Sequence, residues 1–432
     1  MDEIFKILLQ VGLILVFFSI SIFRLKSNKI LILKNITLFD QITFNLIILI
    51  NLILFLSFFN FKIFKIILII SFVIFLSLLY NLVSKYSLKD FEFNLKIFFF
   101  IIFFILISFD LAFNLRLGWD AQKLWFPKVL NFYQGNNIAN LQTLLWPEYP
   151  FLGSLLWSFF WKISFSEYEY LGRLIYVFIF CLSIFSISEI LKLSLIKQIL
   201  FASLSILLVY NYNLFDGHQE IIIFSLIIFA AKYSYLIISE KKLNIFYLIF
   251  LVLIFNALIW TKNEGIFISI FLFLNIFLFS KYKLKYKLIS LILLILFIIL
   301  RMVVFKFYNF EISLQPGSYN NFSINEIFNK ISIDRLVIIY KYIFQSIFKN
   351  YLTLLSGLFM LIYFFKKKNF KDINFVLLYL ILNIIFITFA YLLTDLPIEF
   401  AAKSGTDRLM FEFSGYYLLF IIIYLNEFYK KN

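Results

Sequence analysis

A short segment at residues 117–128 combines an acid with lysines and tryptophans, and it is the most distinctive stretch of the chain. Asp120 follows a Gly-Trp pair at the exit of an apolar run, and Lys123 and Lys128 come soon after it. A carboxylate beside cations at a membrane surface suits chemistry on an anionic lipid head group. Asp120 would be a general base that takes the proton from an acceptor hydroxyl, while the lysines hold a phosphate leaving group.

A structural explanation of the same segment competes with the chemical one. Asp120 would cap the N-terminus of a short helix, and Trp119, Trp125 and Trp146 would form an aromatic belt at the membrane interface. Downstream, Trp146-Pro-Glu-Tyr-Pro150 predicts a rigid extended entry, because residues before proline avoid the helical conformation. The residues themselves leave both explanations open.

The stretch Asp216-Gly-His218-Gln-Glu220 is a second polar site, in a very short connection between apolar runs. His218 is the sole histidine, and with two acids it could bind a divalent cation, so such a cation is a possible cofactor and none is certain. A capping Asp, a turn Gly and a Glu that reaches the interface explain the same residues. They could also line the rim of an active site.

Charged residues later in the chain enlarge the set of candidate ligands. Lys262 and Glu264 would pair with each other, flank a sugar phosphate, or form a solvated turn. Arg301 lies inside an apolar run, where a charge is costly unless it pairs or reaches the interface. Facing the bundle, it would hold a lipid phosphate together with Arg173 and Arg408, and facing lipid it would only reach the interface.

The elements that position these residues are predicted to be membrane helices. Of the 432 residues, 63% are hydrophobic and the mean hydropathy is +0.97, well above what soluble domains contain. Apolar runs of about twenty residues recur, each long enough to cross a hydrocarbon layer as a helix. A lone strand in lipid would leave its backbone unpaired, and a barrel would show shorter alternating segments. We therefore expect an all-α polytopic transmembrane bundle.

Charge and cysteine content exclude other classes. The net charge of +15 is scattered as short basic clusters between apolar runs, so membrane topology explains it better than nucleic-acid binding. Cys181 is the only cysteine, which excludes an internal disulfide and a cysteine metal site. The first apolar run follows two acids and lacks a small-residue cleavage pattern, so we interpret it as a retained span and not a signal peptide.

The length criterion predicts about thirteen spans, beginning near Ile4, Thr43, Phe61, Leu95, Leu171, Gln198, Phe215, Ile245, Gly265, Leu288, Tyr351, Asn374 and Leu409. Basic residues gather in alternate connections, at 24–34, 85–96, 192–197, 241–242, 281–287, 366–371 and 430–431. By the positive-inside rule these are cytoplasmic, which puts the N-terminus outside and the C-terminus in the cytoplasm. Residues 151–163 must then lie at the outer surface without crossing.

The predicted organisation has four parts. Residues 1–94 form an N-terminal three-span extension, and residues 95–306 form a core with an external loop at 114–170 that carries amphipathic surface helices. Residues 307–349 form an external loop with an interfacial helix around 331–347, which is either a lid or acceptor platform or a helix without chemistry. Residues 350–432 form a C-terminal three-span segment.

Several motifs resemble those of the GT-C superfamily of polyprenyl-phosphate-sugar-dependent glycosyltransferases, which includes protein O-mannosyltransferases and lipid A aminoarabinose transferases. Those enzymes carry an acid in the first large external loop, where this chain has Asp120, and then a Pro-Tyr-Pro-like stretch, where it has Glu148-Tyr149-Pro150. Arg173 matches an arginine at the head of the next span. Trp260-Thr-Lys-Asn-Glu-Gly265 and Thr406-Asp-Arg-Leu409 resemble later elements.

The resemblance covers residues 110–265 best, with two departures. Three extra spans precede the loop, and Ala121 follows Asp120 where many members have a second acid. The resemblance implies a membrane glycosyltransferase of the plasma (inner) membrane, with its active site on the periplasmic or extracellular face. It would move a sugar from a polyprenyl-phosphate donor to a hydroxyl of a lipid, glycan or protein acceptor. Asp120 is the expected base, and the expected substrate-binding residues are Lys123, Lys128, Glu148, Tyr149, Arg173, Asp216, His218, Lys262, Glu264, Arg301 and Arg408.

Two other functions make different demands on the chain. A membrane transporter or lipid flippase for a cell-envelope glycolipid would need ionisable residues near the midplane and spans broken by Gly or Pro. All five prolines fall in loops or at the predicted interface, which disfavours that alternative. A structural scaffold in a surface-polymer assembly complex would show no convergent polar cleft.

Overall fold

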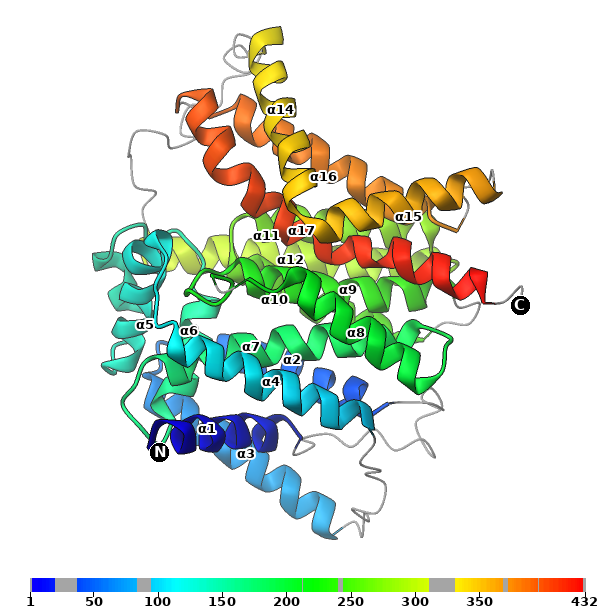
Figure 1. The fold of residues 1–432 in the computed structure, drawn as a ribbon. Helices are drawn as coiled ribbons and strands as arrows, with labels where there is room; N and C mark the ends of the chain where they lie inside the picture. Colours follow the sequence, from blue (N-terminus) through cyan, green and yellow to red (C-terminus); the bar gives the residue numbers. More distant parts are fainter. Residues whose placement is uncertain are drawn as a thin grey trace.

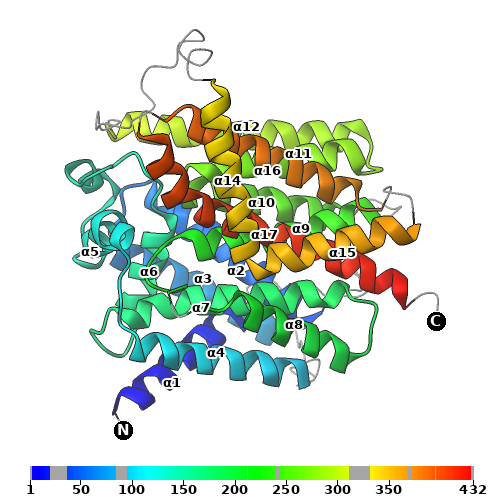
Figure 2. The same ribbon diagram turned by 45° about the horizontal axis from the view of Figure 1, so that its top comes forward.

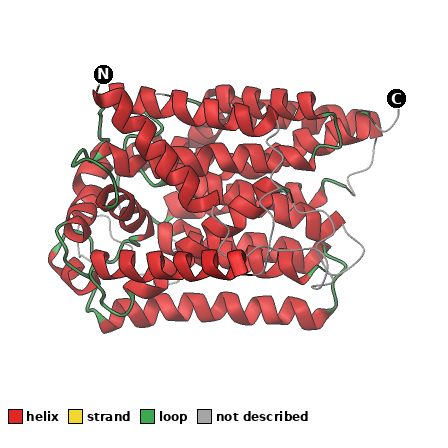
Figure 3. Cartoon of the chain, turned by 90° about the horizontal axis from the view of Figure 1, so that it is seen from below, coloured by secondary structure: helices red, strands yellow, loops and turns green. Residues whose placement is uncertain are grey.

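The computed structural model describes residues 2–19, 37–83, 95–211, 213–239, 244–310, 331–367, 372–394 and 396–429. Every regular element in these ranges is a helix, as Figure 3 shows, so the predicted all-α class is confirmed. The predicted basic clusters at 24–34, 241–242 and 430–431 lie outside the described residues, and those at 85–96 and 366–371 lie partly outside them. The stretch 311–330 of the predicted 307–349 loop also lies outside them.

Each predicted span falls on a helix, and these helices are α1 (Asp2–Ser19), α2 (Leu38–Ser57), α3 (Ile63–Val83), α4 (Leu95–Phe113), α7 (Tyr170–Ile187), α8 (Leu195–Val209), α9 (Glu220–Ser239), α10 (Ile245–Thr261), α11 (Glu264–Phe279), α12 (Leu284–Phe307), α15 (Tyr351–Lys367), α16 (Asn374–Leu392) and α17 (Ile398–Phe428). By length and composition, eight of the described helices can cross a membrane, namely α2, α3, α4, α7, α9, α12, α16 and α17. Helix α17 begins at Ile398 and not near Leu409. The charged residues before Leu409 interrupt the apolar run in the sequence, but they are helical in the structure.

Helices α7, α9 and α17 form the centre of the bundle. Every residue of α7 is buried, and most of α9 and the second half of α17 are buried as well. Figure 1 shows α4, α7, α9 and α10 running side by side with the C-terminal half of α17. Helices α3 and α12 instead expose most of their apolar side chains, which hydrocarbon can cover as well as protein can. The start of α1 and the end of α17 lie at opposite ends of the bundle.

The loop between α4 and α7 contains the π-helix η2 (Ala121–Trp125), α5 (Phe126–Tyr133), the 3-10 helix η3 (Ile138–Thr143) and α6 (Leu152–Lys162). With 11 residues, α6 is too short to cross a membrane, in line with the non-crossing 151–163 segment. It is not the amphipathic surface helix that we expected, because all its residues except Lys162 are buried. Gly172 explains the close packing, since a Cβ there would lie 2.4 Å from the Trp157 carbonyl oxygen.

The amphipathic helix expected around 331–347 is α14 (Ile333–Lys349), and it meets α15 in a sharp bend of 92° at Asn350. Figures 1 and 2 both show α14 lying across the direction of the bundle helices, while α15 runs with them. Helix α14 packs against α17, α15 and α16. We refer to the bend, residues 346–351, as the elbow, because it brings the end of α14 over the start of α9.

Candidate functional site

Asp120 lies in a helical turn directly before the π-helix η2. Its backbone is helical and its carboxylate makes no capping hydrogen bond, so the capping explanation does not hold. The carboxylate instead forms an ion pair with Arg408 of α17, a residue 288 positions away in the sequence. Single-turn π-helices are frequent at functional sites, since the extra residue changes the direction of neighbouring side chains.

Asp120 and Arg408 belong to a chain of ion pairs that we call the Arg408 cluster: Asp120, Glu220, Lys262, Arg408 and Glu412. Arg408 lies 3.7 Å from the carboxylate of Glu220, and Lys262 lies 3.2 Å from the same carboxylate. Lys262 also contacts Glu412, at 2.6 Å. Glu412 is fully buried on α17, whereas Arg408 has 45% of its side chain exposed. The cluster therefore runs from the protein interior to an accessible edge.

The turn between α10 and α11 holds Lys262 in the middle of these acids. Its amine also lies 3.6 Å from Glu264. Burial alone would lower the pKa of Lys262, but the charges of Glu220, Glu264 and Glu412 outweigh it and raise the pKa well above its ordinary value. Lys262 is therefore a permanent cation, and it already forms ion pairs with these carboxylates.

Arg301 secures this turn from α12. Its guanidinium donates to the carbonyl of Ile259 at 2.9 Å and to the side chain of Asn263. Gly265 is required next in the turn, because a Cβ there would lie 1.9 Å from the carbonyl oxygen of Leu258. Arg301 faces the bundle, as one of the two expectations had it, but its described partners are protein groups at the base of the cluster.

The turn at 216–218 brings the sole histidine beside the Arg408 cluster. His218 Nδ1 lies 2.6 Å from a carboxylate oxygen of Asp216, and Gly217 has a φ of 94°. Gly118 donates its N–H to the Asp216 carbonyl at 2.9 Å, and a Cβ on Gly118 would collide with the His218 ring. Burial opposes the charged imidazole, but the hydrogen bond to Asp216 and the charges of Glu220, Asp216 and Asp120 raise the pKa of His218.

Lys128 and Arg173 hold the backbone of the surrounding loops. The buried Lys128 amine donates to the carbonyls of Trp146 at 3.0 Å and Tyr149 at 2.7 Å. Burial lowers the pKa of Lys128 to about 7, although Glu148 nearby acts in the opposite direction. The fully buried Arg173 donates to the carbonyls of Arg116 and Phe215, both at 3.0 Å, and pairs with Glu169 at 2.7 Å.

Of the remaining expected site residues, Lys123 is exposed and makes no ion pair within the described part of the chain. Glu148 and Tyr149 lie with Lys128 and not in the Arg408 cluster, and Tyr149 packs edge-on against Trp125. Glu412 was not among the expected site residues, and Glu220 was considered only for a cation site or the rim of an active site. For Glu412 a signal existed, since an acid inside an apolar run is costly and calls for a partner.

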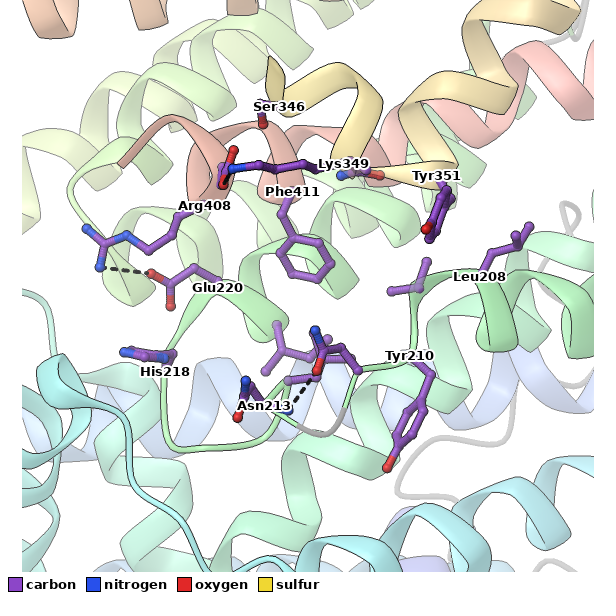
Figure 4. Close-up of a pocket in the computed structure, with 16 residues that line it drawn as sticks. Leu208, Tyr210, Asn213, His218, Glu220, Ser346, Lys349, Tyr351, Arg408 and Phe411 are labelled. Carbon is purple, nitrogen blue, oxygen red and sulfur yellow. Dashed lines mark hydrogen bonds and ion pairs between the residues drawn. The ribbon is translucent and has the colours of Figure 1, made fainter. Parts of the chain in front are cut away.

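Two cavities meet at Arg408, His218 and Asn213. The elbow cavity, of about 400 Å³, lies between the end of α8, the elbow and α17. Figure 4 shows Arg408, Glu220 and His218 converging at one side of it, with Phe411, Tyr351 and Leu208 on its apolar side. The loop cavity, of about 780 Å³, shares Arg408, His218 and Asn213 with the elbow cavity and is otherwise lined by residues 115–119, Gln122 and Asp216.

The Arg408 cluster contains three acids, Asp120, Glu220 and Glu412, and two bases, Lys262 and Arg408. The walls of the two cavities carry the acids Asp216, Glu220 and Asp407, the bases Arg116, Lys349 and Arg408, and His218. The described residues nevertheless contain no group of three or more His, Cys, Asp or Glu side chains placed to hold a metal ion. The divalent cation considered for Asp216, His218 and Glu220 therefore has no preformed protein site there.

A second buried network, the Lys232 cluster, comprises Asp40, Lys96, Glu189 and Lys232. Lys232 of α9 lies 2.7 Å from Asp40 and 2.8 Å from Glu189, and Lys96 lies 3.8 Å from Glu189. Thr37, Ser186 and Tyr233 complete the hydrogen bonds of these groups. Acids and bases are equal in number, and neither of the two cavities described above touches the cluster.

Comparisons with protein-family models, with curated proteins and with solved structures each found no match to this chain. A functional assignment therefore depends on its own residues. The arrangement offers a carboxylate that can take a proton, a guanidinium that pairs with it and can hold an anion, and two cavities that meet at that guanidinium.

Proposed function

We propose that the chain is an integral membrane glycosyltransferase that moves a sugar from a polyprenyl-phosphate donor to an acceptor hydroxyl. In this proposal the chain crosses the plasma (inner) membrane about thirteen times, with its N-terminus outside and its C-terminus in the cytoplasm. The Arg408 cluster is then on the periplasmic or extracellular face. The Lys232 cluster is on the cytoplasmic side, where Lys96 belongs to one of the basic connections.

The observation that carries this proposal is that Asp120 pairs with Arg408, and that Arg408 lines both of the two cavities. The elbow cavity has an apolar side, formed by residues such as Leu208, Ile221 and Phe411, and a charged corner where Arg408 and His218 lie with Glu220. This combination suits a prenyl chain with a phosphate at its head. The loop cavity, which also reaches Arg408, suits the acceptor.

The proposed reaction uses Asp120 as the base and Arg408 as the ligand of the phosphate. The carboxylate of Asp120 takes the proton of the acceptor hydroxyl, and the oxygen attacks the anomeric carbon on the face opposite the phosphate. The bond between that carbon and the phosphate oxygen breaks, so the configuration inverts and the lipid phosphate leaves. Arg408, assisted by protonated His218, stabilises the negative charge on the leaving group. The proton on Asp120 is later released to water.

Donor binding would prepare the base in this scheme. Arg408 is paired with Asp120, and an incoming phosphate competes for the guanidinium because it is also an anion. Once Arg408 turns to the phosphate, Asp120 is free to accept a proton. Glu220, at 3.7 Å, keeps Arg408 in place during the exchange.

The other expected phosphate ligands receive a supporting role in this scheme. Lys128, Arg173 and Arg301 already donate to backbone carbonyls, so we propose that they position the loops and the 262–264 turn. Lys262 neutralises the buried acids of the cluster. Contact with the phosphate is left to Arg408 and His218, with exposed Lys123 at the rim.

Purified protein in proteoliposomes, supplied with radiolabelled sugars on defined prenyl-phosphate carriers, tests the proposal. Asp120→Asn should abolish transfer without changing membrane insertion, and Asp334→Asn, on an exposed acid of α14, is the matched control. A fully active Asp120→Asn protein would overturn the assignment of the base. Absence of transfer from every prenyl-phosphate donor by the unmodified protein would overturn the function itself.

One observation favours a transporter or flippase for a cell-envelope glycolipid instead. Lys232 and Glu412 are ionisable residues buried within helices long enough to span a membrane. A transporter would move an intact glycolipid between leaflets without breaking the bond to its sugar. Chemical analysis of the lipid after incubation separates these functions, because only the transferase releases prenyl phosphate.

A further inference from the structure

Helix α14 carries an exposed apolar stripe along one side. Ile333, Val337, Tyr340, Phe344 and Phe348 follow one another at helical spacing, and their exposed fractions run from 49% to 80%. This stripe differs from the side that packs against α17, where Ile339 and Ile343 are buried. The stripe covers no other element of the described part of the chain.

The polar side of α14 borders the stripe. Asp334, Lys341 and Gln345 are exposed on this side, and so is Lys349 at the C-terminal end of the helix. An apolar side next to a charged side is the pattern of a helix that lies in the plane of a membrane interface. Tyr340 fits this position because its ring is apolar and its hydroxyl needs water or head groups.

The direction of α14 agrees with this pattern. The bend of 92° at the elbow sets α14 across α15, which runs with the bundle helices in Figures 1 and 2. The stripe also continues onto α15 through Tyr351, Leu358 and Leu361, all of which are exposed. The exposed apolar surface is therefore continuous over α14 and α15, which run in different directions. Lipid can cover such a surface.

A second protein is a poorer match for the same surface. The stripe on α14 is about one side chain wide, whereas a stable protein interface buries about 800 Å² on each partner. Hydrocarbon needs no such complementarity, because it adapts to any apolar surface. We propose that α14 lies in the membrane plane with this stripe in the acyl chains of one leaflet and its polar side in water.

Single-cysteine labelling tests this proposal independently of any enzymatic activity. Val337→Cys, Phe344→Cys and Phe348→Cys report on the stripe, and Lys341→Cys and Gln345→Cys report on the polar side. Each carries an environment-sensitive fluorophore in phosphatidylcholine and phosphatidylglycerol vesicles. The unmodified protein is the labelling control, because its only cysteine, Cys181, is buried.

Quenching should alternate with the helical repeat of about 3.6 residues. Stripe positions should be quenched by nitroxide-labelled lipids and protected from iodide, and the polar positions should behave in the opposite way. Stripe probes that iodide quenches as strongly as the Lys341 probe would place the stripe in water and overturn the proposal. Stripe probes protected from both quenchers would show a protein partner or a second copy there, which would also overturn it.

Discussion

The Arg408 cluster and the Lys232 cluster are both buried ion-pair networks, and α9 contributes one residue to each. Glu220 begins α9 and Lys232 lies twelve residues later, about 18 Å along the helix axis. In the Lys232 cluster two acids meet two bases, and neighbouring hydroxyls complete the hydrogen bonds. The Arg408 cluster has more acids than bases and borders two cavities. Both clusters bury charged groups, so buried charge alone does not distinguish a functional site from a network that only stabilises the fold.

The two clusters differ in their accessibility to solvent and in the balance of acids and bases. A balanced, enclosed network has no reason to change its partners, and breaking it leaves a charge uncompensated in the interior. In the Arg408 cluster, Asp120 and Arg408 are partly exposed and their pairing can be exchanged for a ligand. Substitutions should therefore affect stability in the Lys232 cluster and ligand chemistry in the Arg408 cluster.

The largest effect on stability is expected from Lys232→Met. The substitution leaves Asp40 and Glu189 buried without their main cation, and such losses cost about 3–5 kcal/mol. Thermal unfolding in detergent should show a large fall in Tm, while exposed Lys341→Met should leave the Tm unchanged. An unchanged Tm for Lys232→Met would remove the distinction between the two clusters.

A comparable effect, but on transfer and not on stability, is expected from Arg408→Ala. Removal of one group that stabilises the charge of a transition state typically reduces kcat by about 10²–10³-fold. Arg408→Lys should recover part of the rate, since it keeps the charge but loses the planar fork. A rate equal to that of the unmodified protein, measured with prenyl-phosphate donors, would exclude Arg408 from the phosphate site.

A smaller, pH-dependent effect is expected at Lys128. Its pKa is lowered to about 7 by burial, so between that pH and the ordinary lysine pKa the unfolded chain binds more protons than the folded protein. Stability should accordingly rise with pH across this window, and the cost of the buried charge should be fully present below it. Tm measured against pH should show this rise in the unmodified protein and lose it in Lys128→Met. Parallel curves of Tm against pH for the two proteins would show that Lys128 does not cause the rise.

The smallest effect is expected at His218. Because its pKa is raised in the folded protein, the charged imidazole contributes stability that is fully present below the unfolded pKa and is lost as the pH rises through the folded pKa. The Tm difference between the unmodified protein and His218→Gln should shrink from about pH 5 to about pH 8. Asp216→Asn should move this transition to lower pH, and a transition that does not move would show that Asp216 does not hold the histidine charged.

The sequence predicted the helices of this molecule well and the partners of its charged residues poorly. Apolar runs locate α9 or α12 because hydrocarbon-length helices need only local information. The pairing of Asp120 with Arg408 depends on which distant helices are neighbours, and periodicity carries no information on that. Arg301 illustrates the limit, since its position inside an apolar run predicts a buried partner but not whether a phosphate or a carbonyl is that partner.

Buried packing also went undetected where it depends on tertiary contacts. Residues 152–162 form a short apolar helix that could equally lie on a surface or inside the bundle. Gly172 decides between them by admitting the backbone of Trp157, and a single glycine in an apolar run does not reveal that contact.

The most direct test of the account is a matched pair of Asp→Asn substitutions, one in each cluster. Asp120→Asn and Asp40→Asn would be compared for Tm and for the rate of sugar transfer per folded molecule. Asp120→Asn should lose about 10²–10⁴-fold in rate, the usual contribution of a general base, with its Tm unchanged. Asp40→Asn should lower the Tm and leave the rate per folded molecule intact. The reverse pattern, or the same loss of rate in both proteins, would contradict the assignment of chemistry to the Arg408 cluster.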